Sequence, residues 1–158
     1  MQTLIVLVFD NETGAQKMID HVQSLQRQQL ISVADAAYVI RQKSRKVKVK
    51  QVNSLVGSGA LGGAFWGLLV GQYLWLSSYT EAGADATNGV DCGIDPDFLE
   101  EVSNIIKPGY SALLMMVLSM PKEIMLVLAK QSDSLLYTTL NRERETQLRE
   151  AFGIVDDI

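Results

Sequence analysis

Residues 3–9 read Thr-Leu-Ile-Val-Leu-Val-Phe, and residues 10–14 continue with Asp-Asn-Glu-Thr-Gly. The first stretch is short, almost wholly apolar and rich in β-branched residues, which is typical of a buried strand. The second stretch is polar and ends in glycine, so the strand ends there and a helix begins. From Ala15 onward, apolar residues recur at helical spacing as far as about Gln28. A second strand, predicted at 36–41, completes a strand-helix-strand unit.

The following strand is marked by an alternation of charge and valine. Residues 46–52 read Lys-Val-Lys-Val-Lys-Gln-Val, and this period of two predicts a strand with one exposed face. The polar residues 42–45 predict a turn, so we expect a hairpin with strand 36–41. Its lysines suit an exposed sheet edge, because like charges discourage pairing with another molecule.

The last third of the chain repeats the strand-helix-strand plan. Apolar residues 111–118 predict a buried strand, 121–130 a short amphipathic helix and 135–140 another strand. We expect a closing surface helix at 143–152. Ahead of this unit, a helix is predicted from Asp95, as its N-cap, and Pro96 to about Ile106, where Lys-Pro-Gly stops it.

Two strand-helix-strand units in 158 residues predict a single domain, residues 1–158, with an α+β fold. The expected architecture is a ferredoxin-like βαβ-βαβ sandwich. Between its halves lie the basic strand, then an insert at 54–94 that holds a glycine-zipper helix and an acidic loop, and then the helix that follows. A flavodoxin-like sheet is the alternative, but it would need more helices and fewer hairpins.

A glycine ladder dominates the insert: Gly59, Gly63, Gly67 and Gly71 stand four residues apart within the uncharged stretch 55–76. Each interior glycine weakens a helix by roughly 1 kcal/mol relative to alanine, so another surface must pack closely against this bare backbone. We predict that the ladder joins copies of the chain in a homo-oligomer. The predicted interface comprises Gly59, Gly63, Gly67, Gly71, Phe65, Trp66, Leu68 and Trp75. Packing against the chain's own sheet is the alternative, and for the two tryptophans we favour burial in the core.

The stretch 55–76 has 22 residues, and a helix of that length spans about 33 Å, enough to cross a membrane. Two observations oppose crossing. If both halves share one sheet, the number of crossings must be even, and the only return segment contains Glu81, Asp85 and Asp91. Such charges cost roughly 2.5 to 3.5 kcal/mol each at mid-bilayer. The chain opens with no basic leader, so we expect a cytoplasmic protein; the alternative is a membrane-associated protein whose apolar insert enters the bilayer beside the basic strand.

Charge is segregated on the two sides of the ladder. The basic patch before it comprises Arg41, Lys43, Arg45, Lys46, Lys48 and Lys50. The acidic residues after it are Glu81, Asp85, Asp91, Asp95, Asp97, Glu100 and Glu101. The patch suits docking on an anionic membrane surface, or pairing with the acidic segment. A net charge of −4 and the lack of aromatic residues among the cations argue against nucleic acid as a partner.

Residues that commonly carry chemistry are few. Cys92 is the only cysteine and His21 the only histidine, which excludes an internal disulfide and argues against the commoner zinc and iron sites. Asp10, Glu12 and Asp20 could hold magnesium, but a helix cap is the expected role of Asp10. His21 falls on the polar side of its helix, so we expect a solvated surface histidine. We therefore predict no enzymatic activity, no cofactor, no metal and no identifiable small-molecule substrate.

Three strings together resemble one bacterial family: Val-Lys-Val-Lys-Gln-Val-Asn at 47–53, Gly-Ala-Leu-Gly-Gly-Ala-Phe-Trp-Gly-Leu-Leu-Val-Gly at 59–71, and Gly-Ile-Asp-Pro-Asp-Phe-Leu at 93–99. The family is the one catalogued as domain of unknown function 1269, often labelled predicted membrane protein. The resemblance spans nearly the whole chain, and it implies no known reaction and no catalytic residues. Its members usually continue with a second apolar, Gly/Ala-rich segment, whereas residues 77–91 here are polar.

Overall fold

The computed structural model describes residues 2–44, 46–52, 55, 66, 94 and 96–140. These residues form an α+β protein with a five-stranded antiparallel sheet and three helices. The elements in chain order are β1 (Gln2–Phe9), α1 (Gly14–Arg27), β2 (Ser32–Arg41), β3 (Val47–Gln51), α3 (Pro96–Ile105), β4 (Tyr110–Ser119), α4 (Lys122–Gln131) and β5 (Ser134–Leu140). The strands and helices predicted within these ranges are all present, and β2 begins four residues earlier than predicted. The helix expected at 143–152 lies outside the described residues.

The strand order is β3-β2-β4-β1-β5, and every pairing is antiparallel. Helix α1 joins β1 to β2, yet β4 lies between these strands. Helix α4 likewise joins β4 to β5, with β1 between them. The two strand-helix-strand units are therefore interleaved. The flavodoxin-like alternative is wrong, because such a sheet is built from parallel strands.

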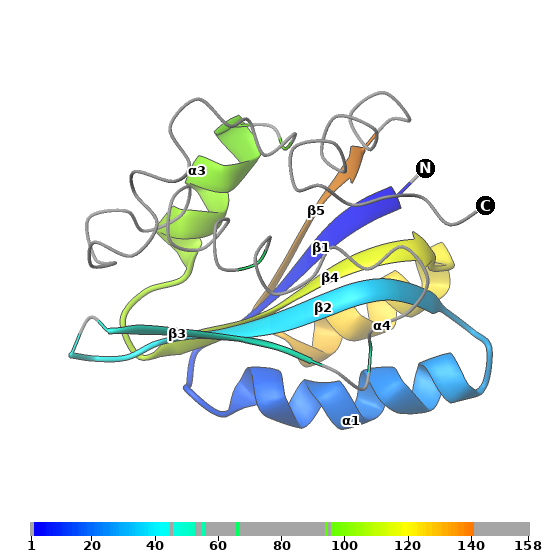
Figure 1. Cartoon of the computed structure of the whole chain (residues 1–158), viewed down its shortest axis with the longest axis horizontal. Helices are drawn as coiled ribbons and strands as arrows, with labels where there is room; N and C mark the ends of the chain where they lie inside the picture. The colour runs from blue at the N-terminus through cyan, green and yellow to red at the C-terminus, as the bar shows by residue number, and fades with distance from the viewer. Residues whose placement is uncertain are drawn as a thin grey trace.

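The sheet is covered on both faces, and Figure 1 shows α1 and α4 on one side with α3 on the other. We call these the helix-pair face and the α3 face. Alternate residues of β1 supply both: Ile5 and Leu7 pack with residues of α1 and α4, while Leu4 and Val6 pack with residues of α3. A strand that is buried on both sides needs apolar residues at successive positions, not only at alternate ones. This explains why the apolar runs of β1 and β4 are almost continuous.

The α3 face is closed by more than α3 itself. Phe98, Leu99 and Val102 of α3 pack over the sheet, and Trp66 and Ile94 belong to the same buried cluster. Trp66 is helical and only 1% exposed. One residue of the glycine-rich segment is therefore fixed in the core of this face.

Candidate functional site

The edge strand β3 divides its side chains between the two faces of the sheet. Val47 and Val49 are half-buried and pack against the core of the α3 face. Lys48 and Lys50 are exposed, and they stand opposite Ile40 and Tyr38 of β2 in the antiparallel register. Because directly paired residues share one face, these lysines lie on the helix-pair side. The predicted hairpin and half-exposed edge strand are confirmed.

A hollow of about 550 Å³ lies where this side of the hairpin meets the first turn of α1. Lys48 and Lys50 line it together with Tyr38, Ile40 and Gln16; Val47 and Val49 complete the lining. The amide Nε2 of Gln16 donates a hydrogen bond of 3.4 Å to the hydroxyl of Tyr38. We call this site the lysine hollow. It combines two cations, an aromatic hydroxyl, an amide and an apolar side chain.

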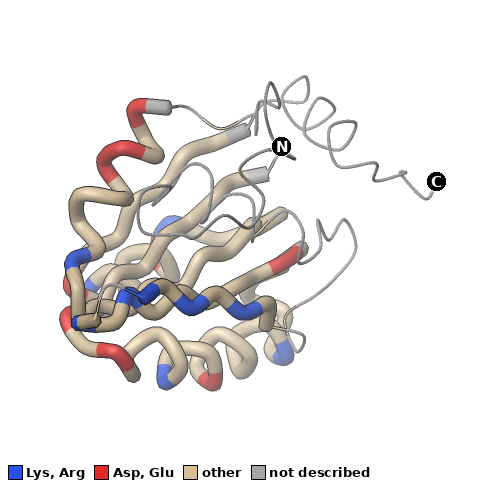
Figure 2. The backbone as a smooth tube through the Cα atoms, turned by 60° about the vertical axis from the view of Figure 1, so that its left-hand side comes forward, with Lys and Arg blue, Asp and Glu red and all other residues tan. Residues whose placement is uncertain are grey.

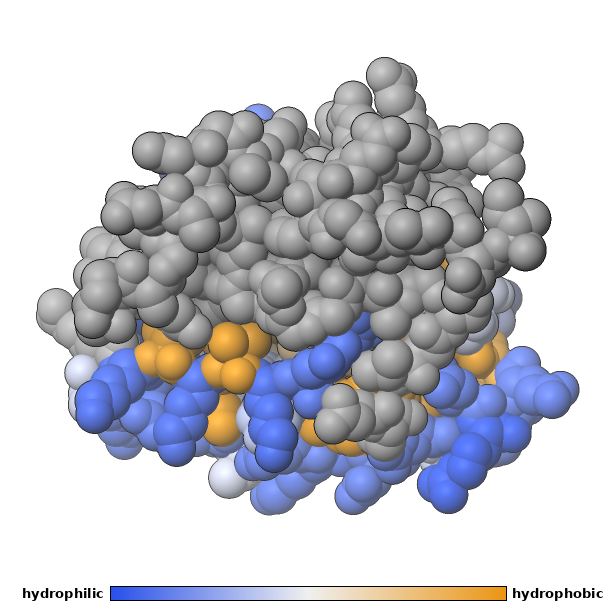
Figure 3. Space-filling model, viewed as in Figure 1, coloured by the Kyte–Doolittle hydropathy of each residue, from blue (hydrophilic) through white to orange (hydrophobic). Residues whose placement is uncertain are grey.

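Figure 2 shows the basic residues of β3 as a row along one edge of the sheet. Lys46, Lys48 and Lys50 recur at every second position, and all three are exposed. No acidic side chain is paired with them among the residues that the structure describes. In the space-filling view of Figure 3, small hydrophobic patches alternate with hydrophilic residues over the described part of the surface that faces the viewer. The edge is thus a positively charged, amphipathic surface.

The other cations of the predicted basic patch, Arg41, Lys43 and Arg45, differ in their surroundings. Arg41 is half-buried, and its Nη1 donates a 2.7 Å hydrogen bond to the carbonyl of Ile106, directly after α3. A cation there complements the negative end of the helix dipole. Lys43 is exposed at the hairpin turn, with its methylene chain beside Gly109. Arg45 lies outside the described residues, and among the described members of the patch the exposed cations are lysines.

The predicted oligomer interface falls almost wholly outside the described residues. This holds for Gly59, Gly63, Gly67, Gly71, Phe65, Leu68 and Trp75, and also for Cys92. Trp66 is the exception, and the expectation that it is a core residue is confirmed by its burial against the α3 face. Its side chain is enclosed by the single chain.

Asp10 is not the helix cap that the sequence predicts. The N-cap of α1 is Thr13, not Asp10, and Thr13 makes no capping hydrogen bond with its side chain. The N–H of Asp10 instead donates a 2.8 Å hydrogen bond to Oδ2 of Asp133, which ties the end of β1 to the entry of β5. Within the loop between β1 and α1, Asn11 Oδ1 accepts a hydrogen bond from the N–H of Thr13. Within the described ranges, no three His, Cys, Asp or Glu residues gather where they could hold a metal ion.

His21 is not the solvated residue that its helical position predicted. It is half-buried, and its Nε2 is enclosed without a hydrogen-bond partner among the described residues. The helical wheel placed it one position from the apolar stripe of α1. The wheel of a single helix does not show how much of a flanking side chain becomes covered in the folded protein.

One buried acid was missed by the sequence analysis. Asp35 is 0% exposed and pairs across the sheet with Met116, on the α3 face, just after an irregularity in the register of β2. Its Oδ1 accepts the N–H of Ala36 at 2.8 Å, and the Nε2 of Gln51 lies 3.0 and 3.2 Å from its two oxygens. The carboxylate thereby joins the bulged part of β2 to the end of β3.

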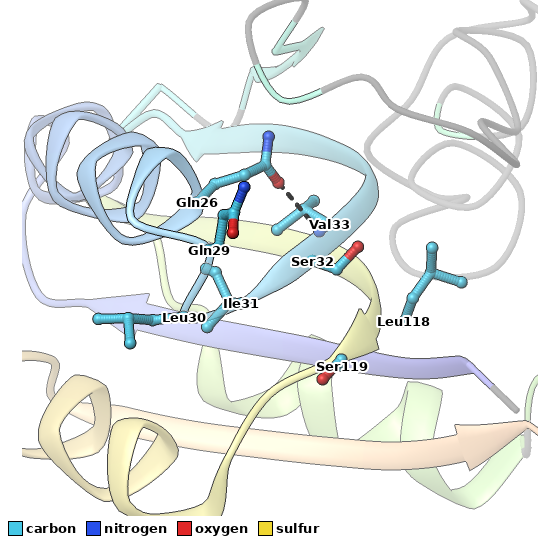
Figure 4. A pocket seen from close by; sticks show the side chains of 8 residues that line it. All are labelled: Gln26, Gln29, Leu30, Ile31, Ser32, Val33, Leu118 and Ser119. Carbon is cyan, nitrogen blue, oxygen red and sulfur yellow. Dashed lines mark hydrogen bonds between the residues drawn. The ribbon is translucent and has the colours of Figure 1, made fainter.

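A second hollow, of about 410 Å³, lies where α1 ends and β2 begins (Figure 4). Its polar lining comes from Gln26, Gln29, Ser32 and Ser119, and its remaining lining from Leu30, Ile31, Val33 and Leu118. The side chain of Gln26 reaches across to accept the N–H of Val33 at 2.9 Å. The lining carries no formal charge, which contrasts with the lysine hollow.

Among the described helices, none combines the length and the apolarity required to cross a bilayer. A family model described as "Protein of unknown function (DUF1269)" matches residues 60–153. No curated protein and no solved structure matches the chain. The matched range runs from the glycine ladder to beyond β5, and it includes the central strand β4 and both helices α3 and α4.

Proposed function

The chain belongs to the DUF1269 family of proteins of unknown function, and we propose that it is a non-enzymatic, self-associating protein. The glycine ladder, Gly59, Gly63, Gly67 and Gly71, forms the contact between copies. The interleaved core acts as the scaffold that presents the ladder. The strand order without β3 is β2-β4-β1-β5, and with its two interleaved units this supports a ferredoxin-like core.

The observation that carries the proposal is the burial of Trp66. This residue is helical and packs on the α3 face. In the predicted glycine-zipper helix, 3.6 residues per turn would place Gly63 and Gly67 about 60° and 100° around the axis from Trp66. We expect such a helix, anchored through Trp66, to direct Gly63 and Gly67 sideways along the sheet surface. A stripe of small residues in that position allows a second helix backbone to approach closely.

The aromatic and leucine side chains of the ladder support a contact between copies. On the same helical wheel, Phe65 and Leu68 stand more than about 90° from Trp66, on the side away from the anchored indole. Large apolar groups so placed require a covering surface. A second copy can supply this covering surface. In a symmetric pair, the flanking side chains of each copy pack on the glycine groove of the other.

Light scattering on protein purified without detergent tests the proposal. We expect a discrete soluble oligomer, and we expect Gly63→Leu combined with Gly67→Leu to reduce the mass to that of one chain. Val127→Leu, which adds a leucine at an exposed position of α4 away from the ladder, is the control and should leave the mass unchanged.

Two outcomes would overturn self-association through the ladder. If the double variant keeps its mass but unfolds at lower urea concentration, the glycines pack within one chain. If the protein is recovered only with membranes or detergent, the alternative of a membrane-associated protein replaces the proposal. Circular dichroism of each variant confirms that the measured mass belongs to folded protein.

A further inference from the structure

We propose that the lysine hollow binds a phosphate ester. Its cations are Lys48 and Lys50, Tyr38 and Gln16 supply the neutral polar groups, and Ile40 supplies the apolar floor. This chemistry is shared by a soluble organic phosphate and by the headgroup of a phospholipid. The binding does not depend on self-association, because none of these residues belongs to the glycine-rich segment.

The charge of the hollow favours a compact anion. Lys48 and Lys50 are two positions apart on one strand face, so their backbones are separated by about 6.6 Å. Both side chains are exposed, and no described acidic side chain neutralises them. Two like charges at this spacing repel each other, and an anion held between them relieves that repulsion. An ammonium group is also a common phosphate ligand in proteins.

The first turn of α1 borders the hollow through Gln16. Gln16 is the third residue of α1, and the first turn of this helix carries no acidic side chain. The backbone N–H groups of a helix start give a partial positive charge that stabilises anions. Acidic residues do occur nearby at Glu12 and Asp20, but neither lines the hollow. Gln16 from the start of α1 and the two lysines of β3 thus line the hollow from different elements.

The neutral groups distinguish an ester from a bare anion. Because Tyr38 accepts a hydrogen bond from Gln16, its own O–H is left to donate to a ligand oxygen. The half-buried ring of Tyr38 and the side chain of Ile40 offer apolar surface beside the cations. A volume of about 550 Å³ lies in the range of small-molecule sites. It fits one phosphate with a small organic group.

The test uses two probes with the full chain. Phenyl phosphate is titrated into ¹⁵N-labelled protein, and amide shifts are followed by NMR. In parallel, co-sedimentation compares phosphatidylglycerol-containing vesicles with pure phosphatidylcholine vesicles. We expect saturable shifts of the amides of Tyr38, Lys48 and Lys50 in the first arm, vesicle binding that requires the anionic lipid in the second, or both. The arm that responds identifies the source of the phosphate.

Paired charge variants decide whether the hollow is the site. Lys48→Gln with Lys50→Gln should weaken binding at least about tenfold, as expected for the loss of charged hydrogen bonds. Lys122→Gln with Lys130→Gln removes the same charge from exposed positions of α4 and should leave binding within about twofold. Circular dichroism checks that both variants fold. Equal weakening by the two variants, or no binding in either arm, would overturn the proposal.

Discussion

Gln29 holds a backbone conformation that suits glycine better than glutamine. Its φ is 62°, in the left-handed region. Its N–H donates to the carbonyl of Gln26, and the N–H of Leu30 donates to the carbonyl of Leu25. These two bonds make the C-terminal helix motif in which glycine is the usual residue at this position. The strain therefore lies in the backbone of Gln29, which borders the hollow of Figure 4.

We predict that Gln29→Gly raises the free energy of unfolding by about 1 kcal/mol, because it removes the Cβ that strains the left-handed conformation. Urea denaturation followed by circular dichroism measures the change. Gln28→Gly is the matched control: Gln28 has a φ of −81°, so glycine brings no relief there and should cost about 0.5–1 kcal/mol. Equal stability of the two variants would contradict the prediction.

Asp35 shows why one important residue was missed. The strand predicted from the sequence begins at Ala36, after this acid. The structure extends β2 to Ser32 and places Asp35 inside the sheet, where hydrogen bonds from Ala36 and Gln51 compensate its burial. Its two described donors come from a register irregularity and a neighbouring strand. Neither can be recognised before the strands are paired.

We predict that Asp35→Ala lowers the free energy of unfolding by about 1–3 kcal/mol, because the amide of Gln51 and the N–H of Ala36 lose their acceptor at a buried site. Asp35→Asn keeps one carbonyl oxygen and should lose less. Urea unfolding of Asp35→Ala, Gln51→Ala and the double variant gives the coupling between the two side chains. We expect about 0.5–3 kcal/mol, whereas strictly additive effects would show that they do not stabilise each other.

Helix α1 meets β1 through a close contact at its first residue. A Cβ built on Gly14 would lie 2.5 Å from Cβ and 2.6 Å from Cγ of Phe9. The atoms it would meet are the fixed base of a buried side chain, so the helix would have to move. The glycine thus sets how closely α1 begins to pack on the sheet, which is a packing requirement and not one of backbone angle.

We predict that Gly14→Ala lowers the free energy of unfolding by about 1–3 kcal/mol through overpacking, although alanine is the better helix former. Lys17→Ala, three residues later and exposed, is the control and should change stability by no more than about 0.5 kcal/mol. Thermal unfolding of both proteins measures the difference. A stabilised Gly14→Ala variant would show that the contact with Phe9 relaxes freely.

The β2–β3 hairpin was the most predictable element. The alternation of lysine and valine predicted the strand, its edge position and its exposed face. It could do so because a side-chain period of two is the period of a strand. The sequence could not reveal the register. It is the register that brings Tyr38 and Ile40 opposite the lysines and α1 beside them. No aromatic residue stands among the cations in the sequence, but the fold places Tyr38 beside Lys48 and Lys50.

At the scale of the whole molecule, two covered sheet faces distinguish the fold from a simple two-layer sandwich. The α+β class and the two strand-helix-strand units were predicted correctly, because each apolar run was unambiguous. The α3 face was not predicted in detail. Its cluster joins residues as distant in sequence as Trp66 and Leu136 with α3. The contacts of Trp66 with this face depend on where the insert packs against the sheet, which the sequence pattern does not specify.

We predict that Trp66→Ala lowers the free energy of unfolding by about 3–5 kcal/mol, as expected for a large side chain removed from a core. Leu126→Ala is the control, because Leu126 is 55% exposed on α4 and should change stability by no more than about 0.5 kcal/mol. Urea denaturation of the two variants measures this contrast. Similar small losses in both would show that the α3 face contributes little to stability.

The interleaved topology has a consequence for how the protein is made. Strands β1 and β2 cannot complete a sheet by themselves, because β4 lies between them and is synthesised about sixty residues after β3. The first three strands must therefore leave the ribosome with apolar edges unpaired, until β4 emerges and inserts between β1 and β2. Contacts of such sequence separation slow folding, and the waiting chain is open to aggregation. A nascent chain truncated before Tyr110 should consequently recruit chaperones, whereas one extended past Leu140 should not.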